Sequence, residues 1–83
     1  MSKYIGLSNL LSQQSSDSIT LTFDKINSLL PTNDGLPASA YKYREWWANN
    51  SKGHSHARSW LEQNFLVDYI NQSEELVTFI RNN

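Results

Sequence analysis

This chain has to stabilise its fold with packed aromatic side chains, because it contains no cysteine. Its 83 residues include three Trp, four Tyr and three Phe. Without cysteine, neither a disulfide nor a thiolate-bound zinc ion can hold the fold together. A domain of this size buries only about 60–65% of the surface of its unfolded chain, and each large ring can contribute about 150–250 Å² of that buried area. We therefore expect one small domain over residues 1–83.

Hydrophobic periodicity divides the chain into helices and strands. Apolar residues at helical spacing predict helices, and alternating apolar and polar residues predict strands. The expected helices cover residues 3–14, 23–30, 38–49 and 56–64, and the expected strands cover 19–23, 65–70 and 76–81. Thr22 is a suitable N-cap for the second helix. The last two strands are expected to pair as an antiparallel hairpin, so the fold class is α+β, with three or four helices and a small antiparallel sheet.

The helix expected at 38–49 contains two adjacent tryptophans. Tyr43 and Trp47 belong to its buried stripe. Successive residues on a helix point about 100° apart, so both tryptophans cannot face the same core. We therefore expect Trp46 at the edge of the stripe, partly exposed, where it could stack on a base. The alternative is that both tryptophans simply pack the small core.

The helix expected at 56–64 should turn Trp60 inward, with His56 and Ser59 facing outward. Asn64 tolerates the left-handed conformation that the end of a helix needs.

The order of these elements, apart from one extra helix, is that of a winged-helix domain. In such domains the last helix before the hairpin enters the major groove, and the hairpin turn touches the DNA backbone. An inference of function from element order alone is an analogy.

The sequence also resembles a family of small, mostly uncharacterised bacterial and phage-type domains over roughly residues 19–81. The shared pattern consists of Leu-Pro-x-Ser-Ala, Tyr, Trp-Trp-x-Asn, Ala-x-x-Trp-Leu and Val-x-Phe-x-Arg. In this chain it is met at 36–40, Tyr43, 46–49, 57–61 and 77–81. Related modules occur beside restriction and other DNA-handling domains, so the resemblance implies DNA binding. Family members often carry Gly where this chain has Asn64.

Positive charge is concentrated between Lys42 and Arg58. This segment has four of the seven Lys and Arg residues and one acid, Glu45, so its formal charge is +3, against −4 for the rest of the chain. A local concentration of basic residues is typical of a surface that contacts phosphate. We therefore predict a non-enzymatic domain that binds double-stranded DNA. The candidate contact residues are Lys42, Arg44, Asn49, Ser51, Lys52, His54, Ser55, His56, Arg58 and Gln63.

The predicted wing is the turn at residues 71–75 between the last two strands, and its charge favours a different function. A wing that touches DNA usually carries Lys or Arg, whereas this one carries Glu74 and Glu75. The alternative is a protein-interaction module, such as a phage- or plasmid-encoded inhibitor or a subunit of a defence complex, or a homodimer. Aromatic residues dominate interface energetics, so Tyr41, Trp46 and Tyr69 are its candidate anchors.

Other classes of function have little support in the sequence. The pair His54 and His56 has no cysteine or carboxylate at ligand spacing, so no metal site is expected. The acidic residues are scattered, and neither a catalytic triad nor a phosphate loop is recognisable. We therefore expect no enzymatic activity, cofactor or small-molecule substrate. The apolar runs are too short to span a membrane and the start of the chain lacks signal-peptide features, which favours a cytoplasmic protein.

Overall fold

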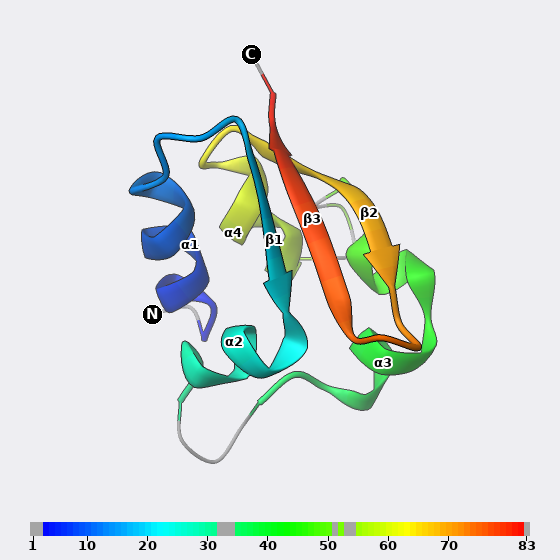
Figure 1. Cartoon of the computed structure of the whole chain (residues 1–83). Helices are drawn as coiled ribbons and strands as arrows, with labels where there is room; N and C mark the ends of the chain where they lie inside the picture. The colour runs from blue at the N-terminus through cyan, green and yellow to red at the C-terminus, as the bar shows by residue number, and fades with distance from the viewer. Residues whose placement is uncertain (1–2, 32–34, 51, 53–54, 83) are drawn as a thin grey trace.

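The fold has a helical layer packed against one three-stranded sheet (Figure 1). It is known from a computed structural model that describes residues 3–31, 35–50, 52 and 55–82. The elements are α1 (Ile5–Ser12), β1 (Ser18–Thr22), α2 (Phe23–Ser28), α3 (Ala38–Lys42), η1 (Arg44–Trp47), η2 (Ser55–Ala57), α4 (Arg58–Leu61), β2 (Phe65–Asn71) and β3 (Leu76–Arg81), where η denotes a 3₁₀ helix. This confirms the predicted α+β class.

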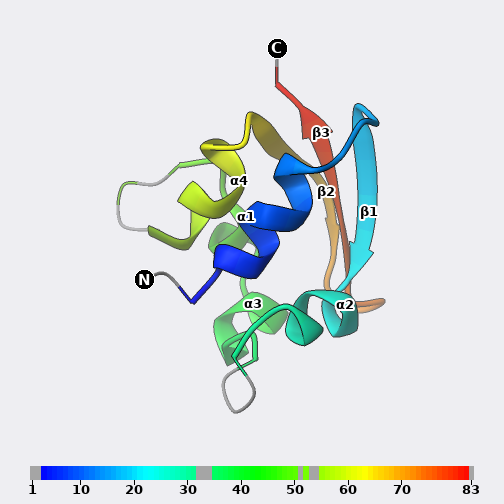
Figure 2. The same ribbon diagram turned by 90° about the vertical axis from the view of Figure 1, so that its left-hand side faces the viewer.

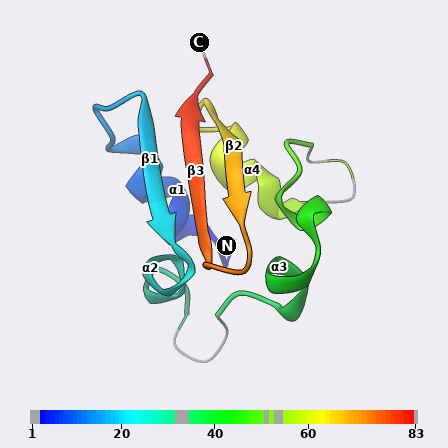
Figure 3. The same ribbon diagram turned by 45° about the vertical axis from the view of Figure 1, so that its right-hand side comes forward.

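The C-terminal strand lies in the middle of the sheet. The strand order is β1-β3-β2, and both pairs are antiparallel. The predicted hairpin of β2 and β3 is confirmed, and β1 adds the third strand. The helices cover one face of the sheet and leave the other uncovered (Figures 2 and 3). This arrangement is compatible with a winged-helix-like fold.

A bulge in β2 changes which residues face the helices. The pairing of β2 with β3 shifts register between Val67 and Tyr69. Phe65 and Ile70 are both buried although they lie five positions apart, and Tyr69 is 50% exposed. A regular strand would place Phe65 and Tyr69 on one face. The extra residue in the bulge therefore moves Tyr69 to the solvent.

Local signals explain how α1 and α2 form. The Thr22 hydroxyl accepts a hydrogen bond from the Lys25 amide at 3.0 Å, so the predicted N-cap is confirmed. Gly6 stands in the first turn of α1, where glycine is unfavourable. A Cβ added at Gly6 would lie 2.3 Å from the Leu29 carbonyl oxygen. Glycine is needed there because the backbones of α1 and the end of α2 approach each other closely.

The helix predicted at 38–49 is broken at Tyr43, and this corrects two expectations. Tyr43 has extended dihedrals (φ −116°, ψ 121°) between α3 and η1. An extended residue resets the direction in which the following side chains point. Tyr43 is consequently 55% exposed, whereas Trp46 and Trp47 are both buried, at 8% and 2% exposure. The prediction that Tyr43 is buried was wrong. Trp46 packs inside the core with Trp47, which matches the alternative that both tryptophans pack the core.

The helix predicted at 56–64 is shorter than expected. A 3₁₀ turn precedes α4, which ends at Leu61. Asn64 has φ 63°, as its predicted left-handed role requires. Ser59 was expected to face outward, but it is only 6% exposed. It lies on the side of α4 that packs against α1.

Aromatic rings form the centre of the core, as the composition predicted. Trp60 is 1% exposed, and Phe65 and Phe79 are fully buried. The Trp47 indole stacks on Phe23 with ring centroids 5.2 Å apart. Its Nε1–H donates to the Ala40 carbonyl at 2.9 Å. The core therefore buries large rings without leaving this indole N–H unpaired.

Candidate functional site

The four cations of segment 42–58 are all exposed and all lie in the helical layer. Lys42 ends α3, Arg44 begins η1, Lys52 lies in the following loop and Arg58 begins α4. Among the residues that the structure describes, ion pairs join only Arg58 to Glu62 and Arg81 to Asp17. Lys42, Arg44 and Lys52 therefore present charge that no described acid neutralises by direct contact. Ser51 and His54, also predicted as contacts, lie outside the described residues.

Asn49 supports the fold, although its side chain is exposed. Its Nδ2 donates to the Val67 carbonyl at 3.0 Å, and its Oδ1 accepts from the Val67 amide at 2.8 Å. The same oxygen accepts from the Trp60 indole N–H at 3.0 Å. The amide thus pairs with the outer edge of β2 and with a core tryptophan at once. One Nδ2–H remains available, so a contact of Asn49 with nucleic acid stays a prediction.

His56 is also part of the scaffold, contrary to its predicted outward position. Its ring lies parallel to the Trp46 indole, with centroids 3.8 Å apart and an interplanar angle of 6°. Its Nε2 is 2.5 Å from the Trp46 carbonyl oxygen. A carbonyl can only accept, so Nε2 carries the proton. The ring is half-buried and fixes the start of α4 to η1.

Arg58 is exposed but has an acidic partner. Its Nε lies 2.9 Å from Glu62 Oε2, one helical turn later. The two side chains are 65% and 59% exposed, so solvent screens the pair and it contributes little to stability. Ser55 is exposed at the start of η2, and Gln63 is half-buried.

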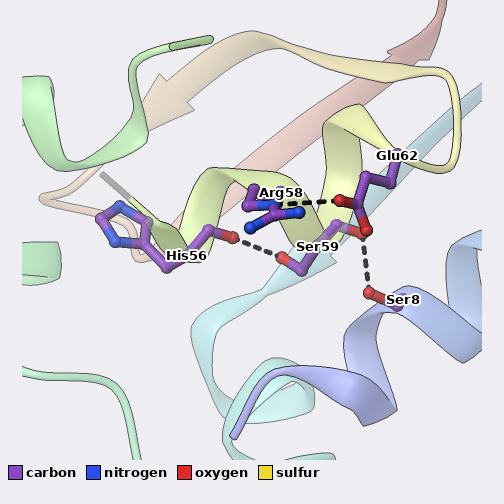
Figure 4. Close-up of polar contacts among 5 residues, drawn as sticks. All are labelled: Ser8, His56, Arg58, Ser59 and Glu62. Atoms are coloured by element: carbon purple, nitrogen blue, oxygen red, sulfur yellow. Dashed lines mark hydrogen bonds and ion pairs between the residues drawn. The ribbon is translucent and has the colours of Figure 1, made fainter. Parts of the chain in front are cut away.

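A cleft of about 510 Å³ separates the start of α1 from η2 and α4. Two serine hydrogen bonds hold its walls: one crosses from α1 to α4, and the other lies within the η2–α4 wall (Figure 4). Ser8 Oγ donates to the Ser59 carbonyl at 3.0 Å, and Ser59 Oγ donates to the His56 carbonyl at 2.7 Å. The cleft is lined by Lys3, Tyr4, Ile5, Ser8, Ser55, His56, Arg58, Ser59 and Glu62.

Lys3 is the residue that sequence reasoning missed. It lies far from segment 42–58 along the chain, yet it lines the same cleft as Arg58. Its ammonium group is 5.7 Å from the centroid of the Tyr4 ring. No local pattern in the sequence indicates that the two cations meet. Only the packing of α1 beside α4 brings them together (Figure 2).

The three predicted anchors of a protein interface do not form one surface. Trp46 is buried at 8% exposure. Tyr41 is half-buried, and its hydroxyl accepts a bond from Asn27 Nδ2 at 3.1 Å. Tyr69 is 50% exposed, on strand β2 and not in the helical layer. A second hollow of about 180 Å³ lies beside Trp46 and the exposed Tyr43.

The hairpin turn is fastened to the helices and does not project as a wing. Gln72 Nε2 donates to the Ala40 carbonyl at 3.0 Å, and the Phe23 amide donates to the Glu75 carbonyl at 2.8 Å. The acidic residues Glu74 and Glu75 are both exposed at this turn. The turn therefore presents negative charge from a fixed position.

Neither a metal site nor a membrane span is found in the described part of the chain. No group of three or more His, Cys, Asp or Glu side chains there is arranged to hold a metal ion. None of the described helices has the length and apolar character needed to cross a membrane.

The helical layer on one face of a three-stranded sheet, with a cleft beside α4, defines a small α+β domain. The chain belongs to the DUF7662 family, a domain of unknown function, whose pattern matches residues 4–82. This agrees with the expected membership of a family of small domains. Comparison with curated proteins and with solved structures finds no match.

Proposed function

We propose that the chain is a non-enzymatic domain that binds double-stranded DNA through the exposed cations of segment 42–58. The observation that supports this most is that Lys42, Arg44, Lys52 and Arg58 are all exposed, and that only Arg58 has an acidic partner among the described residues. Such cations release counterions from DNA when they neutralise phosphates. The proposal also assigns the chain to the cytoplasm, with a bacterial or phage origin.

The geometry favours contacts with phosphates over reading of bases. Helix α4 has only four residues, and two of these, Ser59 and Trp60, are buried. Its exposed side chains are Arg58 and, just beyond the helix, Glu62. A recognition helix reads bases with several side chains that reach into a groove. We therefore propose low sequence specificity, with Arg44 and Arg58 as the principal contacts and Lys42 and Lys52 as phosphate anchors.

A mobility-shift assay with random duplex at two salt concentrations tests this function. Three or four neutralised phosphates predict a slope of about −3 to −4 in log affinity against log salt. The Arg44→Ala/Arg58→Ala double variant should lose binding. Lys25→Ala is the matched control, because Lys25 is an exposed cation on α2, outside the proposed surface. The proposal is refuted if wild-type protein fails to bind at low salt, or if the double variant binds as well as the control.

The alternative of a protein-interaction module, such as an inhibitor or a defence-complex subunit, is favoured by the uncovered face of the sheet. Tyr69 is 50% exposed there, and the apolar residues Leu66, Leu76 and Ile80 on β2 and β3 are only half-buried. Such a partner should be retained in a lysate pull-down at moderate salt and lost with Tyr69→Ala. If the partner is instead lost with the Arg44→Ala/Arg58→Ala variant at moderate salt, the interface includes the exposed cations of segment 42–58.

A further inference from the structure

The cleft between α1 and α4 brings together two cations that the proposed DNA surface does not unite. Lys3 comes from the segment before α1, and Arg58 from the first position of α4. Neither residue is buried, and the cleft volume of about 510 Å³ lies within the range of small-ligand sites. Among the described residues that line the cleft, Glu62 is the only acid. The lining therefore carries a net positive charge.

We propose that this cleft is a binding site for a phosphate group, held between the Lys3 ammonium and the Arg58 guanidinium. This inference extends the proposed function, because it adds Lys3, which lies outside segment 42–58, and names the ligand chemistry of the cleft. The phosphate can belong to a DNA backbone or to a free phosphorylated compound. Both sources offer the same oxygen acceptors, and an experiment can separate them.

The walls of the cleft are preorganised for a ligand. The Ser8 hydrogen bond connects α1 to α4, the Ser59 hydrogen bond joins α4 to η2, and the His56 ring is held against Trp46. These contacts leave the exposed ends of the lysine and arginine as the parts that must reorient. A site that needs little ordering loses less free energy on binding than a flexible one.

Glu62 competes with a bound phosphate for the Arg58 guanidinium. Arg58 uses its Nε for the carboxylate. A guanidinium has five N–H donors in a planar fork that matches phosphate geometry. Any phosphate that enters the cleft can also contact Lys3, and pyrophosphate or a phosphate monoester carries more charge than the carboxylate, so it is expected to displace Glu62. Glu62 thereby weakens the site, and its neutralisation should strengthen binding.

Titration of the whole chain with inorganic pyrophosphate, followed by ¹H–¹⁵N NMR, tests the site itself. The expected shifts lie at Lys3, Arg58 and Glu62. Lys3→Ala and Arg58→Ala should each weaken binding on the order of five- to tenfold, since each removes a charge-assisted contact. Lys25→Ala should leave it unchanged. Shifts spread evenly over all exposed cations, or equal affinity in the three variants, would overturn the proposal.

Neutralising Glu62 provides a second test, in which the expected result is a gain in pyrophosphate affinity and not a loss. Glu62→Gln should strengthen pyrophosphate binding about three- to tenfold, because it removes repulsion and frees Arg58. Glu45→Gln removes the same charge from η1, and Glu45 lines the hollow beside Trp46 and not this cleft. It should have a much smaller effect. Equal effects of the two variants would show a general charge response and would contradict the site.

Binding of random duplex by the same variants identifies the source of the phosphate. If Lys3→Ala weakens duplex binding and lowers the salt slope by about one, the cleft seats a backbone phosphate. If Lys3→Ala weakens only pyrophosphate binding, the ligand is a free phosphorylated compound. If the wild-type protein does not bind duplex but still binds pyrophosphate in the cleft, the DNA proposal fails and this inference stands. If Lys42→Ala/Arg44→Ala abolishes duplex binding while Lys3→Ala changes neither ligand, this inference fails and the DNA proposal stands.

Discussion

Replacing Asn49 by alanine distinguishes a structural side chain from a DNA contact. The Asn49 amide makes three hydrogen bonds, two with the Val67 backbone and one with the indole N–H of Trp60. Asn49→Ala removes all three hydrogen bonds at once. We therefore expect a large loss of stability, whereas a side chain that serves only to contact DNA would leave stability unchanged.

The expected size of this loss follows from the burial of each partner. Trp60 is 1% exposed, so its N–H is left without a partner at a cost of about 1–3 kcal/mol. The Val67 groups lie at the outer edge of β2, where water can replace the lost amide, and they add about 0.5–1 kcal/mol. The sum is about 1.5–4 kcal/mol, a large part of the roughly 4–12 kcal/mol expected for 83 residues. A loss of about 1.5–4 kcal/mol corresponds to a fall in Tm of about 6–30 °C.

Urea unfolding followed by circular dichroism and tryptophan fluorescence measures this loss. Asn50→Ala is the matched control, because Asn50 is exposed and bonds only to the Lys52 amide among the described contacts. Its effect should stay within about 0.5 kcal/mol. In a double-mutant cycle with Trp60→Phe, the coupling energy should be about 1–2 kcal/mol. An Asn49→Ala variant that keeps wild-type stability but loses duplex binding would refute the reasoning and restore Asn49 as a contact residue.

Three further substitutions test the packing, and thermal unfolding checks each of them. Gly6→Ala should lower stability by about 1–3 kcal/mol, since its Cβ would lie 2.3 Å from the Leu29 carbonyl oxygen; an unchanged Tm would show that α1 and α2 can separate freely. Glu75→Gly should raise stability by about 0.5–1 kcal/mol, because Glu75 has φ 58° and glycine adopts that conformation without strain. Glu74→Gly, at the neighbouring position, should give no such gain, and equal effects would contradict the explanation. Arg81→Lys should lower stability by about 1–2 kcal/mol, because the guanidinium bonds two carbonyls of the α1–β1 linker at 2.9 Å, a geometry that an ammonium cannot reproduce; a neutral result would show that charge alone is sufficient.

Local chemistry explains why several features were predictable. The Thr22 cap depends on a hydroxyl next to the first turn of a helix, and the left-handed Asn64 depends on the conformational preference of one residue type. The C-terminal hairpin follows from two alternating segments separated by a short turn. Each signal acts over a few neighbouring residues, so it can be read without knowledge of the rest of the fold.

The errors arise where a short irregularity changes the direction of many side chains. One extended residue, Tyr43, is enough to bury Trp46 and expose its own ring, although the apolar spacing of the segment fits a continuous helix. In β2, the bulge before Tyr69 has the same effect on a strand. Such irregularities depend on how distant segments pack against each other. A periodic pattern of apolar residues describes only regular helices and strands, so it does not predict them.

The amino-acid order was sufficient for the order of helical segments and strands, the hairpin, the reliance on aromatic rings and the concentration of positive charge in segment 42–58, because all of these are properties of near neighbours or of composition. Tertiary packing alone connected Asn49 and His56 to the scaffold and placed Lys3 in the same cleft as Arg58. These outcomes depend on contacts between segments far apart in the chain, whose free energy is gained only when the whole core closes around them.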